Sequence, residues 1–381
     1  MEEVLILSAV RTPIGSINGI LAGYTAPQLG AKAISAALAK SGVKPDEIGE
    51  VVMGNVISAG IGQAPARQAS IGGGLPPSVG ATTVNKVCGS GMKAVMLACQ
   101  SLRLGEESCA VAGGMESMSK APFLLDKARS GYRYGHGTLI DSILKDGLMD
   151  PYSGIHMGDC GELCAEKHAI SREQQDGYAR LSYERALLAQ KDGAFNAELC
   201  DVDGINADEE PGRAKLDKMS KLKAAFKPGG TITAANASKI NDGAAALVLA
   251  NSVGCAGKKA LARVVAWATF SQEPQWFTTA PAGAIEALLQ KTGWTAGSVD
   301  FFEINEAFSV VSLAVMKLAA IPSEKVNVNG GAVALGHPIG ASGARILATL
   351  VHILHKRGAK RGIAAICLGG GEAVAVAVEK V

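Results

Sequence analysis

Apolar residues along the chain follow a helical spacing and then a strand-like run, and this succession occurs twice. Residues 26–58 carry apolar residues at helical intervals, then Gly42, then a short apolar run that ends at Asn55. Residues 280–309 repeat this order, with Gly293 at the corresponding stop. Apolar positions three or four apart predict a helix, and a short apolar run between turn residues predicts a strand. The pattern therefore predicts helix–strand units in two similar halves.

Two further pairs of segments extend the likeness between the halves. In residues 83–102 and 327–354, a glycine-containing turn precedes a predicted helix that begins near 92 in the first half and near 346 in the second. The apolar runs within 109–114 and 364–371 both end in glycines. Continuous apolar runs are typical of strands buried on both faces. We therefore expect an α/β core with sheets covered by helices.

The segment between the two halves has a different composition. Residues 117–240 are richer in charge, and the run 201–221 has few apolar positions. A helical pattern occurs at 172–190 within this segment. Long insertions of this kind in compact domains usually serve function. We expect this one to lie over one edge of the core.

Composition and charge exclude several classes of protein. The 381 residues are 48% hydrophobic and carry a net charge of +2, which argues against bulk electrostatic binding to nucleic acid or membrane. No run approaches the roughly 20 apolar residues of a membrane span. The ends of the chain carry no signal, transit or peroxisomal pattern. We expect a cytoplasmic protein whose eight cysteines are reduced.

One segment of the first half matches a dinucleotide-binding motif only weakly. Residues 89–94, Gly-Ser-Gly-Met-Lys-Ala, fit the dinucleotide-binding pattern before a helix. That pattern needs an acidic residue at the end of the next strand. The next predicted strand ends instead in Gly113-Gly114, so we expect no bound dinucleotide.

Histidines and cysteines in the insertion resemble a metal site only in their spacing. His156, Cys160, Cys164 and His168 are four residues apart. On one continuous helix the outer two would lie about 18 Å apart, at 1.5 Å per residue. Zinc holds its ligands at bond lengths near 2.0–2.3 Å. We therefore expect a helix with buried thiols and no metal.

Cys88 and His337 lie in matching turns of the two halves. Cys88 is followed by Gly-Ser-Gly and a predicted helix, and a reactive thiol needs a base or a helix N-terminus near it. Taken alone, a structural role for Cys88 stays open. His337 lies in a glycine-containing run and is followed by Pro338, which stiffens the chain. This setting favours catalysis by His337 over a core role.

Two other polar residues come at the ends of predicted strands. Cys367 is followed by Leu368 and the glycines 369–371, whose N–H groups are free to point at an anion. Asn305 ends another strand and can orient a water or a carbonyl group. Two thiols, one imidazole and one amide suit acyl transfer at carbon, with N–H groups stabilising oxyanions.

Four blocks in this order resemble the signature blocks of the thiolase family: Asn85–Gly91, Asn305–Phe308, Gly330–Pro338 and Cys367–Gly371. The likeness covers nearly the whole chain. It is greatest to the biosynthetic thiolases, the acetyl-CoA acetyltransferases, because a His-Met pair lies within Gly154–Gly158.

The resemblance implies catalytic roles. Cys88 would carry the acetyl group, and His337 would activate it and form one oxyanion hole with a water held by Asn305. Cys367 would exchange a proton with the methyl carbon of the second acetyl-CoA. The N–H groups of Cys88 and Gly369 would form the second oxyanion hole.

The resemblance also implies the residues that bind coenzyme A, which would be a substrate and product and not a cofactor. Lysines stand at 221 and 223, where the family often has arginine. Glu372 after the last glycines is a further departure. The residues implied are Leu148, His156, Met157, Lys221, Lys223, Phe226, Ala234 and Ser238.

The implied fold has two duplicated βαβαβαβαββ halves in five layers, αβαβα, with an inserted loop domain. Residues 1–117 plus 240–262 would form the N-terminal half, 118–239 the loop domain and 263–381 the C-terminal half. Ser119–Gly137 resembles the tetramerisation loop of the family, so we expect a homo-oligomer, a dimer or a tetramer.

Three alternatives stay open. A decarboxylating ketoacyl synthase of the same superfamily would have a Cys-His-His site, whereas the third group here is Cys367. A scaffold without chemistry would have lost at least one of the four catalytic side chains, and none is lost. A 3-ketoacyl-CoA thiolase of broad chain length, acting in β-oxidation, is the alternative within the family.

Overall fold

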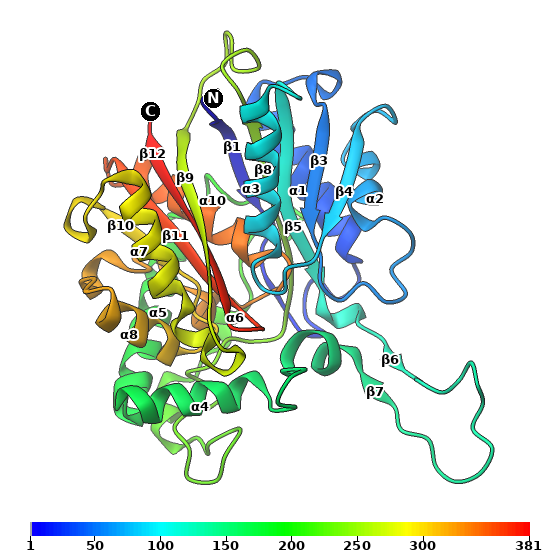
Figure 1. The fold of residues 1–381 in the computed structure, drawn as a ribbon, viewed down its shortest axis with the longest axis vertical. Coiled ribbons are helices and arrows are strands. Elements are labelled where there is room, and N and C mark those ends of the chain that lie inside the picture. The colour runs from blue at the N-terminus through cyan, green and yellow to red at the C-terminus, as the bar shows by residue number, and fades with distance from the viewer. Residues whose placement is uncertain (1) are drawn as a thin grey trace.

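One ten-stranded mixed sheet runs through the computed structural model, which describes residues 2–381 (Figure 1). Its strands follow the order β10-β11-β12-β9-β1-β8-β5-β3-β4, and the short β2 pairs with β8. They are β1 (Leu5–Arg11), β2 (Gly15–Ser16), β3 (Glu50–Gly54), β4 (Gly80–Val84), β5 (Cys109–Ser117), β8 (Asn241–Ala250), β9 (Ala262–Ser271), β10 (Phe301–Ile304), β11 (Arg361–Leu368) and β12 (Glu372–Lys380).

The sheet consists of two halves with the same pairing pattern. In the first half, β3 pairs parallel with β5, β5 pairs antiparallel with β8, and β8 pairs antiparallel with β1. In the second half, β10 pairs parallel with β11, β11 pairs antiparallel with β12, and β12 pairs antiparallel with β9. The halves meet at β1 and β9 through two residue pairs, Leu5 with Arg263 and Ile6 with Ala262. The likeness read from the sequence is therefore a structural repeat.

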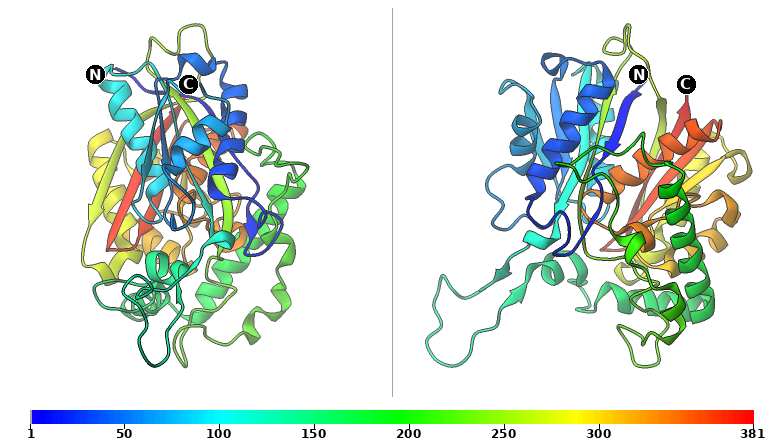
Figure 2. Two further views of the ribbon diagram at one scale, coloured as in Figure 1. Left: turned by 90° about the vertical axis from the view of Figure 1, so that its right-hand side faces the viewer. Right: turned by 180° about the vertical axis from the view of Figure 1, so that it is seen from behind.

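Helices cover both faces of each half and form a shared central layer (Figure 2). Alternate residues of β8 and β12 point to opposite faces, as the period of a strand requires. Ala375 of β12 packs in a cluster with the outer helices of the second half, whereas Val376 packs in a cluster with the two central helices. This is the five-layer αβαβα arrangement that the resemblance implied. The helices are α1 (Ala26–Ser41) and α2 (Pro65–Gly72) outside the first half, α3 (Ser90–Leu104) and α10 (Ser342–Lys356) in the centre, and α7 (Ala280–Thr292) and α8 (Ser309–Leu318) outside the second.

Local signals explain where the helices begin and end. Thr25 and Gln28 form a capping box at the start of α1, and Gly42 ends the helix with φ 71°. Gly293 ends α7 in the same left-handed conformation, with φ 68°. The central helices α3 and α10 begin at Ser90 and Ser342, earlier than the sequence predicted. There the expectation was wrong, because glycines that we took for turn residues lie inside the first turn of each helix.

The inserted segment 118–239 lies across one edge of the sheet. Figure 1 shows β6 and β7 leading away from the body to a long loop. A later part of the insertion is fixed by Arg11 of β1, which pairs with Glu198 (2.5 Å) and with both oxygens of Asp208. All three side chains are buried. The elements of the insertion are β6 (Phe123–Leu124), β7 (Ile140–Asp141), a π-helical turn (Leu144–Leu148), α4 (Met157–His168), α5 (Arg172–Lys191) and α6 (Glu210–Arg213).

Within residues 2–381, no helix is long and apolar enough to cross a membrane. Cys160 and Cys164 lie buried on α4, as the sequence indicated. His156 caps the same helix, with its Nδ1 accepting a hydrogen bond from the N–H of Gly158 at 2.9 Å. These side chains therefore have packing and capping partners.

Candidate active site

Cys88 follows a strained turn between β4 and α3. Val87, the residue before it, has φ 45°, which a β-branched residue rarely adopts. Side chains hold this turn in place: Asn85 accepts a hydrogen bond from the N–H of Val87, and Ser90 accepts one from the N–H of Lys86. In the second half, Gly336 with φ 108° precedes His337. Both turns place a chemically active side chain just before a central helix.

Burial dominates the titration of Cys88 and raises the pKa of its thiol to about 12. The backbone N–H groups of Gly369 and of Cys88 itself lie near the sulfur and lower that pKa by a smaller amount. Although Cys88 lies just before a helix, burial outweighs any stabilisation of the thiolate by the helix dipole. The resting side chain is therefore a thiol that needs a base.

His337 has the protonation state of such a base. Its Nδ1 lies 2.6 Å from the Oγ of Ser342, whose hydroxyl donates to the carbonyl of Pro338 at 2.9 Å. Because that hydroxyl proton is already used, Nδ1 carries the imidazole proton and Nε2 keeps a lone pair. Nε2 lies 3.5 Å from the Nδ2 of Asn305. Burial and then the charge of Arg345 lower the pKa of His337 to about 3, so the ring stays neutral.

Cys367 supplies a second protonated thiol. It lies at the end of β11, fully buried, opposite Ala373 of β12. Burial, followed by the nearby Cys88, raises the pKa of Cys367 well above its ordinary value. The glycines after it turn back with positive φ at Gly370 and Gly371, which brings the N–H of Gly369 to Cys88.

A charge pair joins the two turns around Cys88. Lys86, in the turn before Cys88, pairs with Glu372, which begins β12 after the glycines. Both side chains are partly exposed. The pair connects the first half of the molecule to the second at the rim of the site, and it gives Glu372 a partner that the sequence did not reveal.

A cavity of about 490 Å³ leads to His337. Five residues that the sequence proposed for coenzyme A line it, namely Leu148, His156, Phe226, Ala234 and Ser238. Met157 lies beside Gly369, since a β-carbon built on that glycine would be 3.7 Å from the methionine sulfur. Lys221 and Lys223 are exposed and are not among the lining residues.

Aromatic packing shapes one wall of the cavity. The rings of His156 and Phe226 stack with centroids 4.7 Å apart. Phe308, directly after the Asn305–Ala307 segment, meets Phe226 edge-on at 6.0 Å. Such pairs contribute about 0.5–1.5 kcal/mol beyond the area they bury. The wall is therefore a packed aromatic surface.

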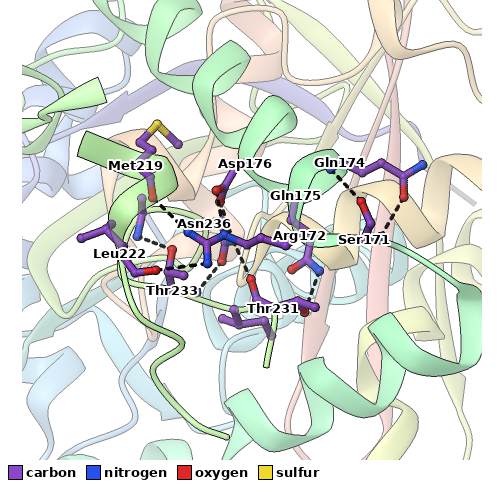
Figure 3. A network of polar contacts seen from close by, with 12 residues as sticks. Ser171, Arg172, Gln174, Gln175, Asp176, Met219, Leu222, Thr231, Thr233 and Asn236 are labelled. Carbon is purple, nitrogen blue, oxygen red and sulfur yellow. Dashed lines mark hydrogen bonds and ion pairs between the residues drawn. The ribbon is translucent and has the colours of Figure 1, made fainter. Parts of the chain in front are cut away.

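Polar contacts anchor the loop of residues 231–238 to α5 (Figure 3). Asn236 donates to Asp176 at 2.9 Å, and Arg172 donates to the same carboxylate at 2.7 Å. Arg172 also donates to the carbonyls of Met219 and Leu222, which flank Lys221. The network fixes the loop that carries Ala234 and Ser238, and with it the segment of the two lysines.

Comparison with known proteins decides the family. Residues 4–252 match the family model for the thiolase N-terminal domain, and residues 258–380 match that for the thiolase C-terminal domain. The chain belongs to the thiolase family. This confirms the family and the fold that the sequence predicted.

Full-length relatives share about half of the residues of this thiolase. Acetyl-CoA acetyltransferase 2 of Arabidopsis thaliana is 52% identical over 99% of the chain and 97% of its own length. A cytosolic acetyl-CoA acetyltransferase of Gibberella zeae is 47% identical over 100% and 98%. The crystal structure of the Acat5 thiolase from Ascaris suum in complex with coenzyme A superimposes with a TM-score of 0.96, at 45% identity and full coverage of both chains.

Several residues at the site of this thiolase escaped the sequence reasoning. Asn241 accepts a hydrogen bond from the N–H of His337 at 2.9 Å, and Ser342 bonds its ring. Glu210, Arg213 and Lys239 line the cavity. Ser342 could have been found from the sequence, because a serine hydroxyl in a helix often bonds the carbonyl four residues earlier, which here is that of Pro338. The others depend on contacts between distant segments.

Proposed function

We propose that the protein is an acetyl-CoA C-acetyltransferase. It joins two molecules of acetyl-CoA into acetoacetyl-CoA and CoA, and it cleaves acetoacetyl-CoA in the reverse direction. The observation that carries the proposal is the geometry of His337, whose Nδ1 bonds Ser342 and whose Nε2 lies 3.5 Å from Asn305, at the wall of the cavity. The names of its full-length relatives support the same substrate.

In cleavage, the sulfur of Cys88 attacks the 3-keto carbon of acetoacetyl-CoA while Nε2 of His337 takes the thiol proton. The bond between the second and third carbons breaks. The Cys367 thiol donates its proton to the departing carbon, so that acetyl-CoA leaves and Cys367 becomes a thiolate. N–H groups and the water held by Asn305 stabilise the oxyanions.

The second half-reaction restores the resting state. Free CoA gives its thiol proton to Cys367, and its sulfur attacks the acetyl group on Cys88. The sulfur of Cys88 leaves and recovers its proton from His337. The second acetyl-CoA is released, and every proton has returned to its first position. Condensation is this sequence in reverse.

We propose short acyl chains as substrates, because Met157 lies against Gly369, which in turn lies beside Cys88. The pantetheine arm would be held by Leu148, His156, Phe226, Ala234 and Ser238. The exposed Lys221 and Lys223 would bind the nucleotide end. We also propose that residues 118–239 act as one coenzyme-binding unit and that its β6–β7 extension joins copies of the chain. The cytosolic relative supports a cytoplasmic location.

The test is CoA-dependent loss of acetoacetyl-CoA by wild type, Cys88→Ala and Cys367→Ala, with mass spectrometry of the quenched proteins. Rapid cleavage by wild type, an acetyl group on Cys88, and near-complete loss in both variants are expected. A protein that never carries acetyl on Cys88 would refute the proposal. Cleavage of a C8 3-ketoacyl-CoA in preference to acetoacetyl-CoA would instead assign the broad chain-length activity. Light scattering tests the oligomer.

A further inference from the structure

Lys239 donates hydrogen bonds to three segments of the chain at once. Its Nζ lies 2.8 Å from the hydroxyl of Tyr183 on α5, 2.8 Å from the carbonyl of Ala237, and 3.0 Å from the carbonyl of Val333. An ammonium has three N–H donors, so this geometry uses all of them. The side chain also lines the cavity that leads to His337.

Val333 belongs to α9 (Ala332–Leu335), a single turn that ends just before His337. The N–H of Val333 donates to the carboxylate of Glu306 at 3.0 Å, while its carbonyl accepts from Lys239. One helical turn leaves its terminal N–H and C=O groups without partners inside the helix. A carboxylate near its N-terminus and an ammonium near its C-terminus complete these bonds and complement the helix dipole.

The side chain of Asn241, two residues after Lys239, bonds the backbone of the catalytic histidine. Asn241 accepts the N–H of His337, and Ser238, just before Lys239, lines the cavity. The segment 237–241 therefore contacts the coenzyme pocket at one end and His337 at the other, with Lys239 bonded to α9 between them.

Charged and titratable groups around the ammonium come from three elements. Tyr183 faces it from α5, Glu210 from α6, and Glu306 from the loop after β10. Burial lowers the pKa of Lys239 to about 8, and the two glutamates oppose that change. The protonated form supplies all three donors, so the three contacts together depend on the charge.

We infer that Lys239 is a positioning residue: its ammonium holds the α9 turn against the segment 237–241, so that Nε2 of His337 lies where Cys88 needs it. The inference rests on the proposed acetyl transfer for its role in turnover. The expected consequence is that loss of the ammonium lowers the rate of proton transfer more than the affinity for CoA.

The test compares Lys239→Ala and Lys239→Met with the control Lys291→Ala, whose exposed ammonium donates to one carbonyl, that of Trp267. The readouts are kcat, KM for CoA, and the rate at which iodoacetamide alkylates Cys88. Both Lys239 variants should lose kcat by about ten- to a hundredfold, as for a misplaced catalytic group. Cys88 alkylation should slow in parallel, and KM should change little.

Ammonium chloride distinguishes positioning from a general loss of structure. It should restore part of kcat in Lys239→Ala, where a small cation fits the vacated space, and none in Lys239→Met, where the side chain fills that space. Sodium chloride at equal ionic strength is the salt control. Lys239→Met keeps the length of the chain and decides the question if Lys239→Ala does not fold.

Three results would overturn the inference: wild-type kcat in folded Lys239 variants, a loss confined to KM with normal Cys88 alkylation, or a loss in folded Lys239→Ala that ammonium does not relieve. Because alkylation needs no acyl-CoA, it tests Lys239 even if wild type proves inactive on acetoacetyl-CoA. That inactivity would refute the proposed function alone.

Discussion

Gly91 and Gly343 lie against each other's helices where α3 crosses α10. A β-carbon on Gly91 would be 2.9 Å from the backbone nitrogen of Ala344, and one on Gly343 would be 2.6 Å from that of Met92. Side chains do not pack at such distances, so only glycines permit this crossing. Since Cys88 and His337 shortly precede the two helices, the crossing fixes how closely the turns that carry them approach each other.

Gly343→Ala should therefore affect both stability and rate. Overpacking at the crossing should lower the free energy of unfolding by about 1–3 kcal/mol. Displacement of the His337 turn should lower kcat by up to about a hundredfold. Urea denaturation and acetoacetyl-CoA cleavage measure the two effects. Gly177→Ala on α5 is the control, because nothing lies within 4 Å of the added carbon, and it should stabilise the protein by about 0.5–1 kcal/mol.

Ser342→Ala should leave the imidazole of His337 without the partner that fixes its tautomer. We expect kcat to fall by about ten- to a hundredfold, which is part of the 10²–10⁴ that a general base contributes. KM for CoA should stay the same, because Ser342 is absent from the cavity lining. Ser342→Thr, which keeps the hydroxyl, should recover most of the rate. The control is Ser41→Ala, whose hydroxyl bonds Leu38 in α1. An unchanged kcat in Ser342→Ala would contradict this role.

His337 should also make the folded state sensitive to acid. Its pKa is about 3 in the folded protein and ordinarily about 6.5 in an unfolded chain. Between these values the unfolded chain binds a proton that the folded protein does not, so stability falls as pH decreases from 6.5 towards 3. Urea midpoints measured from pH 7 to 4 should fall more steeply for wild type than for His337→Asn. Parallel curves would argue against a buried neutral histidine.

The same depressed pKa predicts the shape of the activity profile. Nε2 remains unprotonated above about pH 3, so kcat/KM for acetoacetyl-CoA should show no decline centred on pH 6.5. Initial rates between pH 8 and 5.5, with stability checked at each pH, measure this. A clear inflection near pH 6.5 would mean that the ring titrates as an exposed histidine does, and it would contradict the buried neutral imidazole.

Arg11→Met tests the connection between the insertion and the sheet. The change leaves two buried carboxylates, those of Glu198 and Asp208, without their cation, which should cost about 3–5 kcal/mol. Lys32→Met breaks an exposed pair with Asp203 and should change stability little. Urea denaturation compares the two variants. Equal small effects would show that the buried triad does not hold the insertion.

Local patterns in the sequence predicted the elements that local chemistry controls. Nearby residues account for the ends of α1 and α7 at Gly42 and Gly293. The apolar spacing and the capping box account for α5. The starts of α3 and α10 were misjudged, because glycine usually interrupts a helix. Here Gly91 and Gly343 lie inside the two helices, because each packs against the helix of the other half. The same limit explains why Lys239 and Asn241 were missed: their partners Val333 and His337 are distant in sequence, and nothing near them reveals the contact.

Placing β1 (Leu5–Arg11) in the middle of the sheet has a consequence for synthesis on the ribosome. This strand emerges well before its partners β8 and β9, which are made only after the whole insertion. At about 5–20 residues per second, β1 waits on the order of ten seconds or more for a neighbour. Its apolar residues lack their native neighbours for that time, because the central strands can pair only when β8 and β9 have been made.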